Sequence, residues 1–152
     1  MPFAFHFKYE KTLNIKKEAK AVFSFIKDYP AAIPDFFPAI CRFEEQNPGV
    51  YFWEFEPMSY GGKTFTISLC TQFEERVNQI NILPVPKTGN AVLRGRWAIE
   101  PQLTGCCLNF FFDLEFEVPL PLLTKSLILP IANKELLKLF DRYTTNVQNH
   151  FK

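Results

Sequence analysis

The chain has 152 residues, of which 47% are hydrophobic and 22% are charged, and its formal net charge is +1. These values exclude intrinsic disorder, and the interspersed charge signs exclude the basic surface of a nucleic-acid-binding protein. The length predicts one domain over residues 1–152, and the 18 phenylalanines predict an interior that is densely aromatic or shaped around an apolar molecule.

No segment predicts insertion into a membrane or secretion. The apolar runs Leu120–Leu123 and Leu127–Ile131 are separated by polar residues, and each is too short to span a bilayer. The N-terminal residues lack the basic and apolar segments of a secretory signal. The four cysteines, at positions 41, 70, 106 and 107, form no Cys-x-x-Cys pair. They predict reduced thiols in a soluble, intracellular protein of the cytoplasm.

The first two elements are predicted to be a strand and a helix. Apolar and polar residues alternate over Phe3–Ile15, as in a strand with one buried face. Lys11 interrupts the apolar face, so we expect its ammonium group near a strand end or an opening. Over Lys16–Tyr29 the apolar residues change to helical spacing, and Pro30 ends the helix.

A proline-rich segment, Pro30–Pro38, follows, and a second short helix could start at Pro34. The adjacent Phe36 and Phe37 cannot both face one core, so one of them is expected near the surface. There it could pin the helical insert to the sheet, or it could make a transient contact with a membrane or a partner.

Six further strands are predicted, each with alternating apolar and polar residues and each bounded by a turn. They span Ile40–Gln46, Val50–Glu56, Thr64–Glu75, Gln79–Val85, Ala91–Glu100 and Cys106–Val118. Because the connections between them are short, the strands must form an antiparallel meander. The prediction is an α+β fold with a seven-stranded sheet, one face apolar and the other in water.

The last predicted element is a long helix within Leu120–Phe151. Its apolar stripe consists of Leu129, Ala132, Leu136, Phe140, Tyr143, Val147 and Phe151. An isolated helix is marginally stable in water, so we expect this one to lie in the concave side of the curved sheet. Pro130 interrupts the pattern and predicts a break or a kink.

This order of elements resembles the START-like, helix-grip superfamily, which includes Bet v 1-type and polyketide cyclase-like (SRPBCC) proteins. The similarity extends over essentially the whole chain. The strand GNAVLRGRWAIEP, the lead-in PLPLL and the closing helix are most similar to a branch common in photosynthetic lineages. The resemblance implies a cavity between the sheet and the long helix that accepts hydrophobic ligands, and it implies that some members are enzymes.

The geometry of a meander predicts where the mouth of such a cavity lies. The turns Pro57–Lys63 and Pro84–Asn90 and the segment Val118–Ser126 fall at the same end of the sheet. The predicted ligand-binding residues near this mouth are Phe55, Tyr60, Phe65, Leu93, Phe112, Leu114, Ser126 and Leu129. Tyr60 and Ser126 supply sparse polar groups. Inward aromatic residues at strand spacing more often pack a core, and a cavity forms only if the helix stands off the sheet.

The sequence predicts no catalytic residue, no metal ligand and no cofactor site. It contains no nucleophile elbow or phosphate loop, and its histidines and cysteines are not spaced to bind zinc or iron. His6 and His150 are predicted to be surface residues, and the acids that alternate outward are predicted to form a solvated sheet face. A general acid or base inside the cavity would have to be Tyr60, Tyr143, Lys11 or Glu10.

We therefore predict a protein that binds or transports a small hydrophobic molecule, such as a lipid, an isoprenoid or a pigment-like compound. A cyclase- or aromatase-type enzyme is the first alternative, and it requires an ionisable side chain that projects into the cavity. A ligand-free interaction protein with a packed interior is the second alternative. Nucleic acid, a transmembrane segment and a cofactor are not expected, and the sequence leaves the oligomeric state open.

Overall fold

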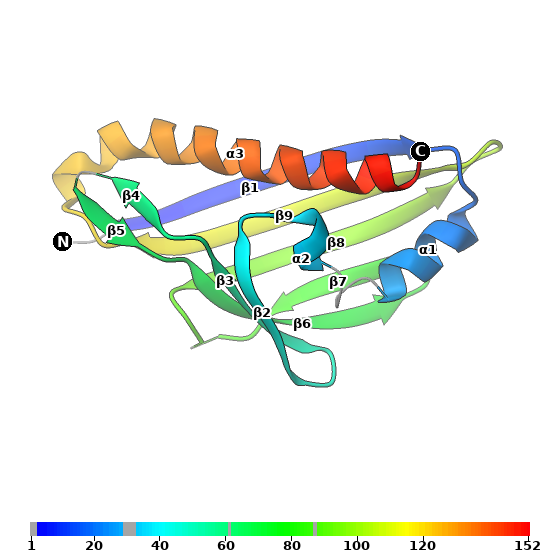
Figure 1. The fold of residues 1–152 in the computed structure, drawn as a ribbon, viewed down its shortest axis with the longest axis horizontal. Coiled ribbons are helices and arrows are strands. Elements are labelled where there is room, and N and C mark those ends of the chain that lie inside the picture. Colours follow the sequence, from blue (N-terminus) through cyan, green and yellow to red (C-terminus); the bar gives the residue numbers. More distant parts are fainter. Residues whose placement is uncertain (1–2, 29–32, 61, 87) are drawn as a thin grey trace.

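The chain folds into a sheet with a long helix across it, and the computed structural model describes residues 3–28, 33–60, 62–86 and 88–152 (Figure 1). In chain order the elements are β1 (Phe3–Ile15), α1 (Ala19–Asp28), α2 (Ile33–Phe36), β2 (Ile40–Asn47), β3 (Val50–Phe55), β4 (Met58–Tyr60), β5 (Lys63–Phe65), β6 (Ser68–Arg76), β7 (Gln79–Pro84), β8 (Ala91–Pro101), β9 (Cys106–Val118) and α3 (Lys125–His150). A 3-10 turn over Leu122–Thr124 leads directly into α3.

Seven strands form one antiparallel sheet in the order β1-β9-β8-β7-β6-β3-β2. The first and last strands of the chain are neighbours, and they pair along their full length, from Phe3 opposite Val118 to Ile15 opposite Cys106. Alternate side chains of both strands are buried on one face of the sheet. Helix α3 runs along β1 and covers this face (Figure 1). The predicted α+β helix-grip fold with a seven-stranded sheet and a long terminal helix is confirmed.

One predicted strand is divided in two. The alternation predicts a single strand over Thr64–Glu75, but the structure has β5 and β6, and β5 pairs with β4 in a separate two-stranded ribbon. The side chain of Asn90 accounts for the break. It accepts a hydrogen bond from the N–H of Ser68 at 2.9 Å and donates one to the carbonyl of Thr66 at 2.6 Å. Backbone groups that would otherwise pair with a neighbouring strand are therefore hydrogen-bonded to this side chain instead.

The helical insert between β1 and β2 agrees with the prediction except at its boundaries. Helix α1 begins later than predicted and buries Val22 and Ile26, and the predicted second short helix is α2. Phe37 is 2% exposed and its ring packs against that of Phe140, whereas Phe36 is partly exposed. The prediction that one of these two adjacent rings lies near the surface is therefore confirmed.

Helix α3 is continuous through Pro130, so the first of the two predicted alternatives, a break, does not occur, and the kink stays a prediction. Pro130 lies in the second turn, and the carbonyl of Ser126, which loses its usual partner, belongs to an exposed residue that water can reach. The buried stripe consists of Ile128, Ala132, Leu136, Phe140, Tyr143, Thr144 and Val147. It begins at Ile128 instead of Leu129, which is partly exposed.

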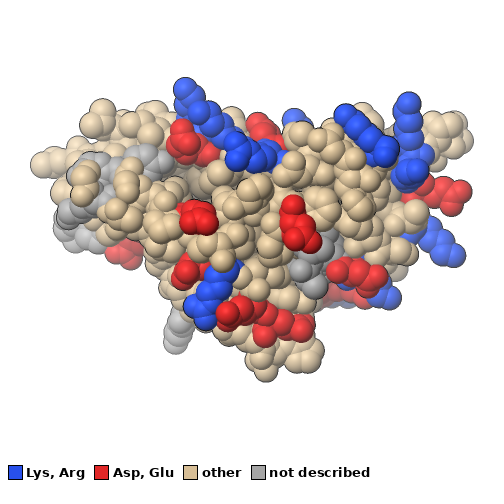
Figure 2. All heavy atoms as spheres, viewed as in Figure 1, with Lys and Arg blue, Asp and Glu red and all other residues tan. Residues whose placement is uncertain are grey.

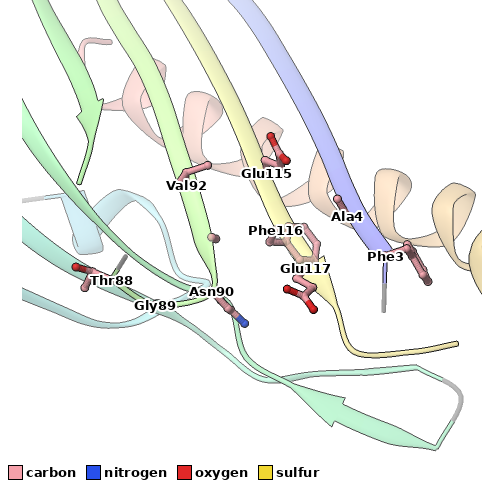
Figure 3. A pocket seen from close by; sticks show the side chains of 10 residues that line it. Phe3, Ala4, Thr88, Gly89, Asn90, Val92, Glu115, Phe116 and Glu117 are labelled. Atoms are coloured by element: carbon pink, nitrogen blue, oxygen red, sulfur yellow. The ribbon is translucent and has the colours of Figure 1, made fainter. Parts of the chain in front are cut away.

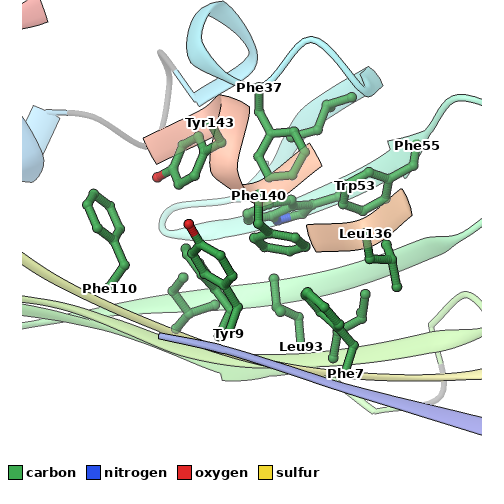
Figure 4. Packing of buried hydrophobic residues seen from close by; sticks show 14 of the residues in the cluster. Phe7, Tyr9, Phe37, Trp53, Phe55, Leu93, Phe110, Leu136, Phe140 and Tyr143 are labelled. Atoms are coloured by element: carbon green, nitrogen blue, oxygen red, sulfur yellow. The ribbon is translucent and has the colours of Figure 1, made fainter. Parts of the chain in front are cut away.

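Aromatic rings fill the space between the middle of α3 and the sheet (Figure 4). The ring centroid of Phe140 lies 5.1–5.4 Å from those of Phe7, Tyr9, Phe37 and Phe112. All five side chains are at most 4% exposed. The helix is in direct contact with the sheet here, so room for a ligand has to be sought elsewhere along α3.

Candidate functional site

A cleft of about 390 Å³ opens where the N-terminal part of α3 faces the rim of the sheet. The helix forms one side of it with Ile131, Glu135 and Leu139, which follow one another at four-residue spacing. The other side comes from the end of β3, from β4 and from the α2–β2 connection. Its residues are Ala39, Phe55, Glu56, Pro57, Met58 and Ser59. We call this space the α3–β4 cleft.

Backbone hydrogen bonds hold the sheet side of the α3–β4 cleft in place. The N–H of Glu56 donates to the carbonyl of Ala39 at 2.7 Å, which fixes the α2–β2 connection against the end of β3. The N–H of Phe55 donates to the carbonyl of Ile67 at 2.9 Å. The Phe55 ring centroid lies 5.6 Å from that of Phe37, so the floor of the cleft is continuous with the aromatic core.

The floor of the cleft is apolar, and its polar groups lie at the edges. Glu56 and Glu135 are both exposed, and the Glu135 carboxylate lies 3.6 Å from the ammonium group of Lys138. The hydroxyl of Ser59 is hydrogen-bonded to that of Thr64 at 2.9 Å. An apolar molecule with one polar end would match this distribution of side chains.

Of the eight predicted ligand-binding residues, Phe55 lines the α3–β4 cleft. Four more belong to the core and are at most 7% exposed: Phe65, Leu93, Phe112 and Leu114. Their side chains point inward, as the strand alternation predicts, but they contact other side chains of the core. Among the predicted strand residues, Phe55 therefore lies in the cleft, and the other four lie in the core.

The three remaining predicted residues come from the mouth region. Leu129 is partly exposed and packs against the core, Ser126 is exposed, and the side chain of Tyr60 lies outside the described residues. Ile131 and Leu139 were not predicted. Their spacing along α3, with Glu135 midway, is a helical signal that could have identified this side of the cleft.

A group of hydrogen-bonded polar side chains lies between α3 and β1. The Tyr9 hydroxyl donates to a carboxylate oxygen of Asp141 at 2.7 Å and lies 3.0 Å from the hydroxyl oxygen of Thr144. Burial raises the pKa of Tyr9 above its usual value; the bond to Thr144 opposes this shift, and Asp141 adds to it. Tyr9 therefore stays protonated as a hydrogen-bond donor, beside a partly buried carboxylate. Neither Tyr9 nor Asp141 was among the predicted acids and bases.

The predicted acid and base candidates lie in other surroundings. Tyr143 is 1% exposed, and its hydroxyl accepts a hydrogen bond from Nε1 of Trp97 at 3.0 Å. Glu10 and Lys11 are exposed on β1 and border a hollow of about 310 Å³ on the outer face of the sheet. The fourth candidate, Tyr60, again falls outside the described side chains. Lys11 is exposed and borders this hollow, and the expected position of its ammonium group stays a prediction.

Both histidines are at the surface, as predicted. His6 is exposed and pairs with the carboxylate of Asp113 across the β1–β9 ladder. His150 is in the last turn of α3, where its ring stacks on that of Phe25 with centroids 4.3 Å apart. Neither ring lines the α3–β4 cleft.

A second hollow, of about 460 Å³, lies on the outer face of the sheet, where β8, β9 and β1 are neighbours (Figure 3). Glu115, Glu117 and Asn90 border it, and all three are exposed. Acidic side chains in water agree with the predicted solvated face of the sheet. Because this hollow faces away from α3, we do not take it as the ligand site.

Three further features of the described residues bear on the function. No helix among them combines the length and the apolar sequence needed to cross a membrane. The same part of the chain contains no cluster of three or more His, Cys, Asp or Glu side chains placed to hold a metal ion. The four cysteines are free thiols.

Comparison with known proteins identifies similar structures. No protein-family model matches the chain, and no curated protein matches its sequence. A START superfamily protein from Mycobacterium smegmatis is 18% identical, with a TM-score of 0.62 over 95% of this chain and 96% of its own. The KanY protein, solved by NMR, has a TM-score of 0.66 at 15% identity over 95% of this chain and 96% of its own. The Zhui aromatase/cyclase from a Streptomyces species has a TM-score of 0.53 at 16% identity over 95% and 90%.

These matches establish the fold, because at such low identity they do not extend to activity. The chain has the START-like, Bet v 1-like helix-grip fold, which confirms the fold that the resemblance in the sequence implies. The same fold occurs in a START superfamily protein and in an aromatase/cyclase. The fold alone therefore does not separate binding from catalysis.

Proposed function

We propose that this protein binds a small hydrophobic molecule, such as a lipid, an isoprenoid or a pigment-like compound, in the α3–β4 cleft. The observation that supports this most is the cleft itself, which has a volume of about 390 Å³ between the terminal helix and the sheet. Ligand pockets usually measure roughly 300–1,000 Å³. The likeness in fold to a START superfamily protein adds support.

Affinity would come from apolar burial. Apolar surface removed from water contributes about 25 cal/mol per Å², and the cleft offers Phe55, Met58, Ile131 and Leu139 for that contact. A polar end of the ligand would stay at the rim, near the Ser59 hydroxyl. Phe55 is the predicted residue that belongs to this proposed site, and the other seven stay predictions. Those in the core would meet a ligand after a displacement of α3.

Ala39→Phe should weaken ligand binding by roughly tenfold or more, because the new ring occupies the space that the apolar part of the ligand needs. Ala39 is partly exposed at the edge of the cleft, so a larger side chain extends into it. Binding can be measured by native mass spectrometry with palmitic acid and geranylgeraniol as probes.

The matched control for this variant is Ala98→Phe, because Ala98 lies on the outer face of β8, away from the cleft. The control should bind both probes as the wild type does. Equal affinity of Ala39→Phe and wild type would contradict the α3–β4 cleft as the site. A wild type that binds neither probe and carries no lipid on extraction would favour the ligand-free interaction protein.

A cyclase- or aromatase-type enzyme is a second candidate, favoured by the polar group between α3 and β1. The enzyme hypothesis requires an ionisable side chain that projects into the cavity. Asp141 is partly buried and hydrogen-bonded to Tyr9 at 2.7 Å, but it does not line the α3–β4 cleft, so this reaction would need a separate opening between α3 and β1. The likeness in fold to the Zhui aromatase/cyclase agrees with it. In such a reaction Asp141 would take a proton from a carbon next to a carbonyl group, while the Tyr9 hydroxyl would donate a hydrogen bond to the carbonyl oxygen.

If the protein is such an enzyme, Asp141→Asn should slow the cyclisation of a linear poly-β-ketone by roughly 10²–10⁴-fold, since the amide cannot accept the proton. Product formation is followed by liquid chromatography. Asp113→Asn is the matched control, because Asp113 faces outward beside His6. A wild type that does not accelerate cyclisation, or an Asp141→Asn variant as fast as Asp113→Asn, would rule out this role while leaving ligand binding intact.

A further inference from the structure

Four large apolar side chains are exposed together at the start of α3. They are Leu122 (53% exposed), Leu123 (95%), Leu127 (69%) and Ile131 (44%). Leu123, Leu127 and Ile131 are spaced by four residues, so they lie along one side of the helix and the 3-10 turn that precedes it. We call these four residues the apolar tip. A contiguous exposed apolar patch of this kind marks an interaction surface.

The charges around the apolar tip are mainly positive, because Glu135, which follows Ile131 on α3, is paired with Lys138 at 3.6 Å. Between Glu117 and Glu135 the chain contains no acidic residue and two lysines, Lys125 and Lys134. Both lysines are exposed. In the view of Figure 2, no charged side chain is visible over the first turns of α3, and both basic and acidic side chains lie farther along the helix. The tip is thus an apolar surface accompanied by positive charge, which is complementary to an anionic surface.

The apolar tip is continuous with the α3–β4 cleft. Ile131 belongs to both, since it is part of the exposed row on α3 and lines the cleft. The β4–β5 ribbon lies at the same end of the molecule, beside the start of the helix (Figure 1). A molecule that leaves an apolar medium at the tip could therefore enter the cleft without crossing water.

The size of the apolar tip favours a lipid surface over a protein partner. Stable protein interfaces involve roughly 20–30 residues on each side, and the tip offers four large apolar side chains. Such a row with basic neighbours is suited to shallow insertion at the boundary between headgroups and acyl chains. No helix of the described residues can cross a bilayer, so the contact would be superficial.

We propose that the apolar tip docks onto bilayers that contain anionic phospholipids. Leu123 and Leu127 enter the edge of the acyl region, and Lys125 and Lys134 meet the headgroup phosphates. This docking site is distinct from the Phe36 ring, which packs against side chains of α1 and α3. The inference deepens the proposed function, because it names the surface from which the cleft would take its ligand, but the docking itself needs no ligand.

The test is sedimentation of the purified full chain with phosphatidylcholine vesicles, with and without phosphatidylglycerol. The wild type is expected to bind the anionic vesicles. The double variant Leu123→Asp, Leu127→Asp should lose roughly tenfold or more of this binding, because two inserting side chains become charged. Lys125→Glu with Lys134→Glu should lose about tenfold on anionic vesicles and little on neutral ones.

The matched control is Val77→Asp with Leu103→Asp. These side chains are also exposed, at 92% and 105%, but they lie in the β6–β7 and β8–β9 turns, at the end of the molecule opposite the start of α3 (Figure 1). The control should bind vesicles as the wild type does. Because all the substituted leucines and valines are exposed, circular dichroism should show the same fold in every variant.

Three results would overturn the docking proposal. One is a wild type that does not sediment with anionic vesicles, and another is an equal loss in the control variant. The third is light scattering that shows a dimer which the aspartate substitutions in the tip dissociate, since the tip would then be an interface between copies. The vesicles carry no added ligand, so failure here leaves the result with palmitic acid and geranylgeraniol unaffected, and the reverse also holds.

Discussion

Phe140→Ala should lower the free energy of unfolding by about 3–5 kcal/mol, the usual cost of deleting a buried aromatic side chain. The Phe140 ring is 1% exposed and contacts rings from β1, β9 and the segment after α2. Its removal takes away the contact that holds the middle of α3 on the sheet. Urea unfolding followed by circular dichroism measures the change.

Leu137→Ala is the matched control for Phe140→Ala. Leu137 lies on the same helix but is 43% exposed, so its truncation should cost less than about 1 kcal/mol. If the two variants lost the same stability, packing against the sheet would not be what holds α3. A folded Phe140→Ala variant would also test the carrier hypothesis. The void left by the ring lies beside Phe37, which in turn contacts Phe55 on the floor of the cleft. The variant should therefore bind more of the palmitic acid probe than the wild type does.

The fold follows from the sequence because its longest patterns are unambiguous. In β1 and β9 apolar residues alternate along both strands with a single interruption at Lys11, and in the structure the same apolar residues are buried. Because the turns after β2 are short, strands that follow one another in the chain are expected to lie side by side and antiparallel. The strand order confirms this. A strong period in a long segment therefore predicted both the type of element and its buried face.

The division between β5 and β6 could not be predicted in the same way. Phe65, Ile67 and Leu69 are all buried, so the alternation continues across the break. What interrupts the strand is a pair of hydrogen bonds from Asn90, which is distant in the sequence. A periodic pattern reports which side chains face inward, and it does not report which partner the backbone groups find.

The site was predicted less well than the fold, because the sequence shows in which direction a strand side chain points but not how far the facing helix lies from it. The strand period shows that Leu93 and Phe112 point toward α3, but whether a space remains there depends on how closely the helix approaches. Phe140 fills that space. On the helix itself, Ile128 and Leu129 are both apolar, so composition alone could not show which of the two turns inward. Ile131, which borders the cleft, follows them by three and two residues and lies on another side of the helix.

Gly105→Ala should destabilise the protein by about 2 kcal/mol or more, because it combines backbone strain with a steric clash. Gly105 has a φ of +93° in the turn between β8 and β9, where its carbonyl accepts a hydrogen bond from Gln102 at 3.1 Å. A Cβ at this position would lie 2.1 Å from the carbonyl oxygen of Ile15. That residue is the last of β1 and pairs with Cys106, so the clash would separate the end of β1 from β9.

Gly62→Ala separates the two contributions to the cost at Gly105. Gly62 also has a positive φ, +76°, but a Cβ there would meet no atom within 4 Å. The substitution should therefore cost only the left-handed backbone strain, about 1–2 kcal/mol. Thermal and urea unfolding of both variants measure the difference. If Gly105→Ala cost no more than Gly62→Ala, the close approach of β1 to this turn would not contribute to the loss of stability. The β1–β9 ladder would then be looser at this end than the contact with Ile15 indicates.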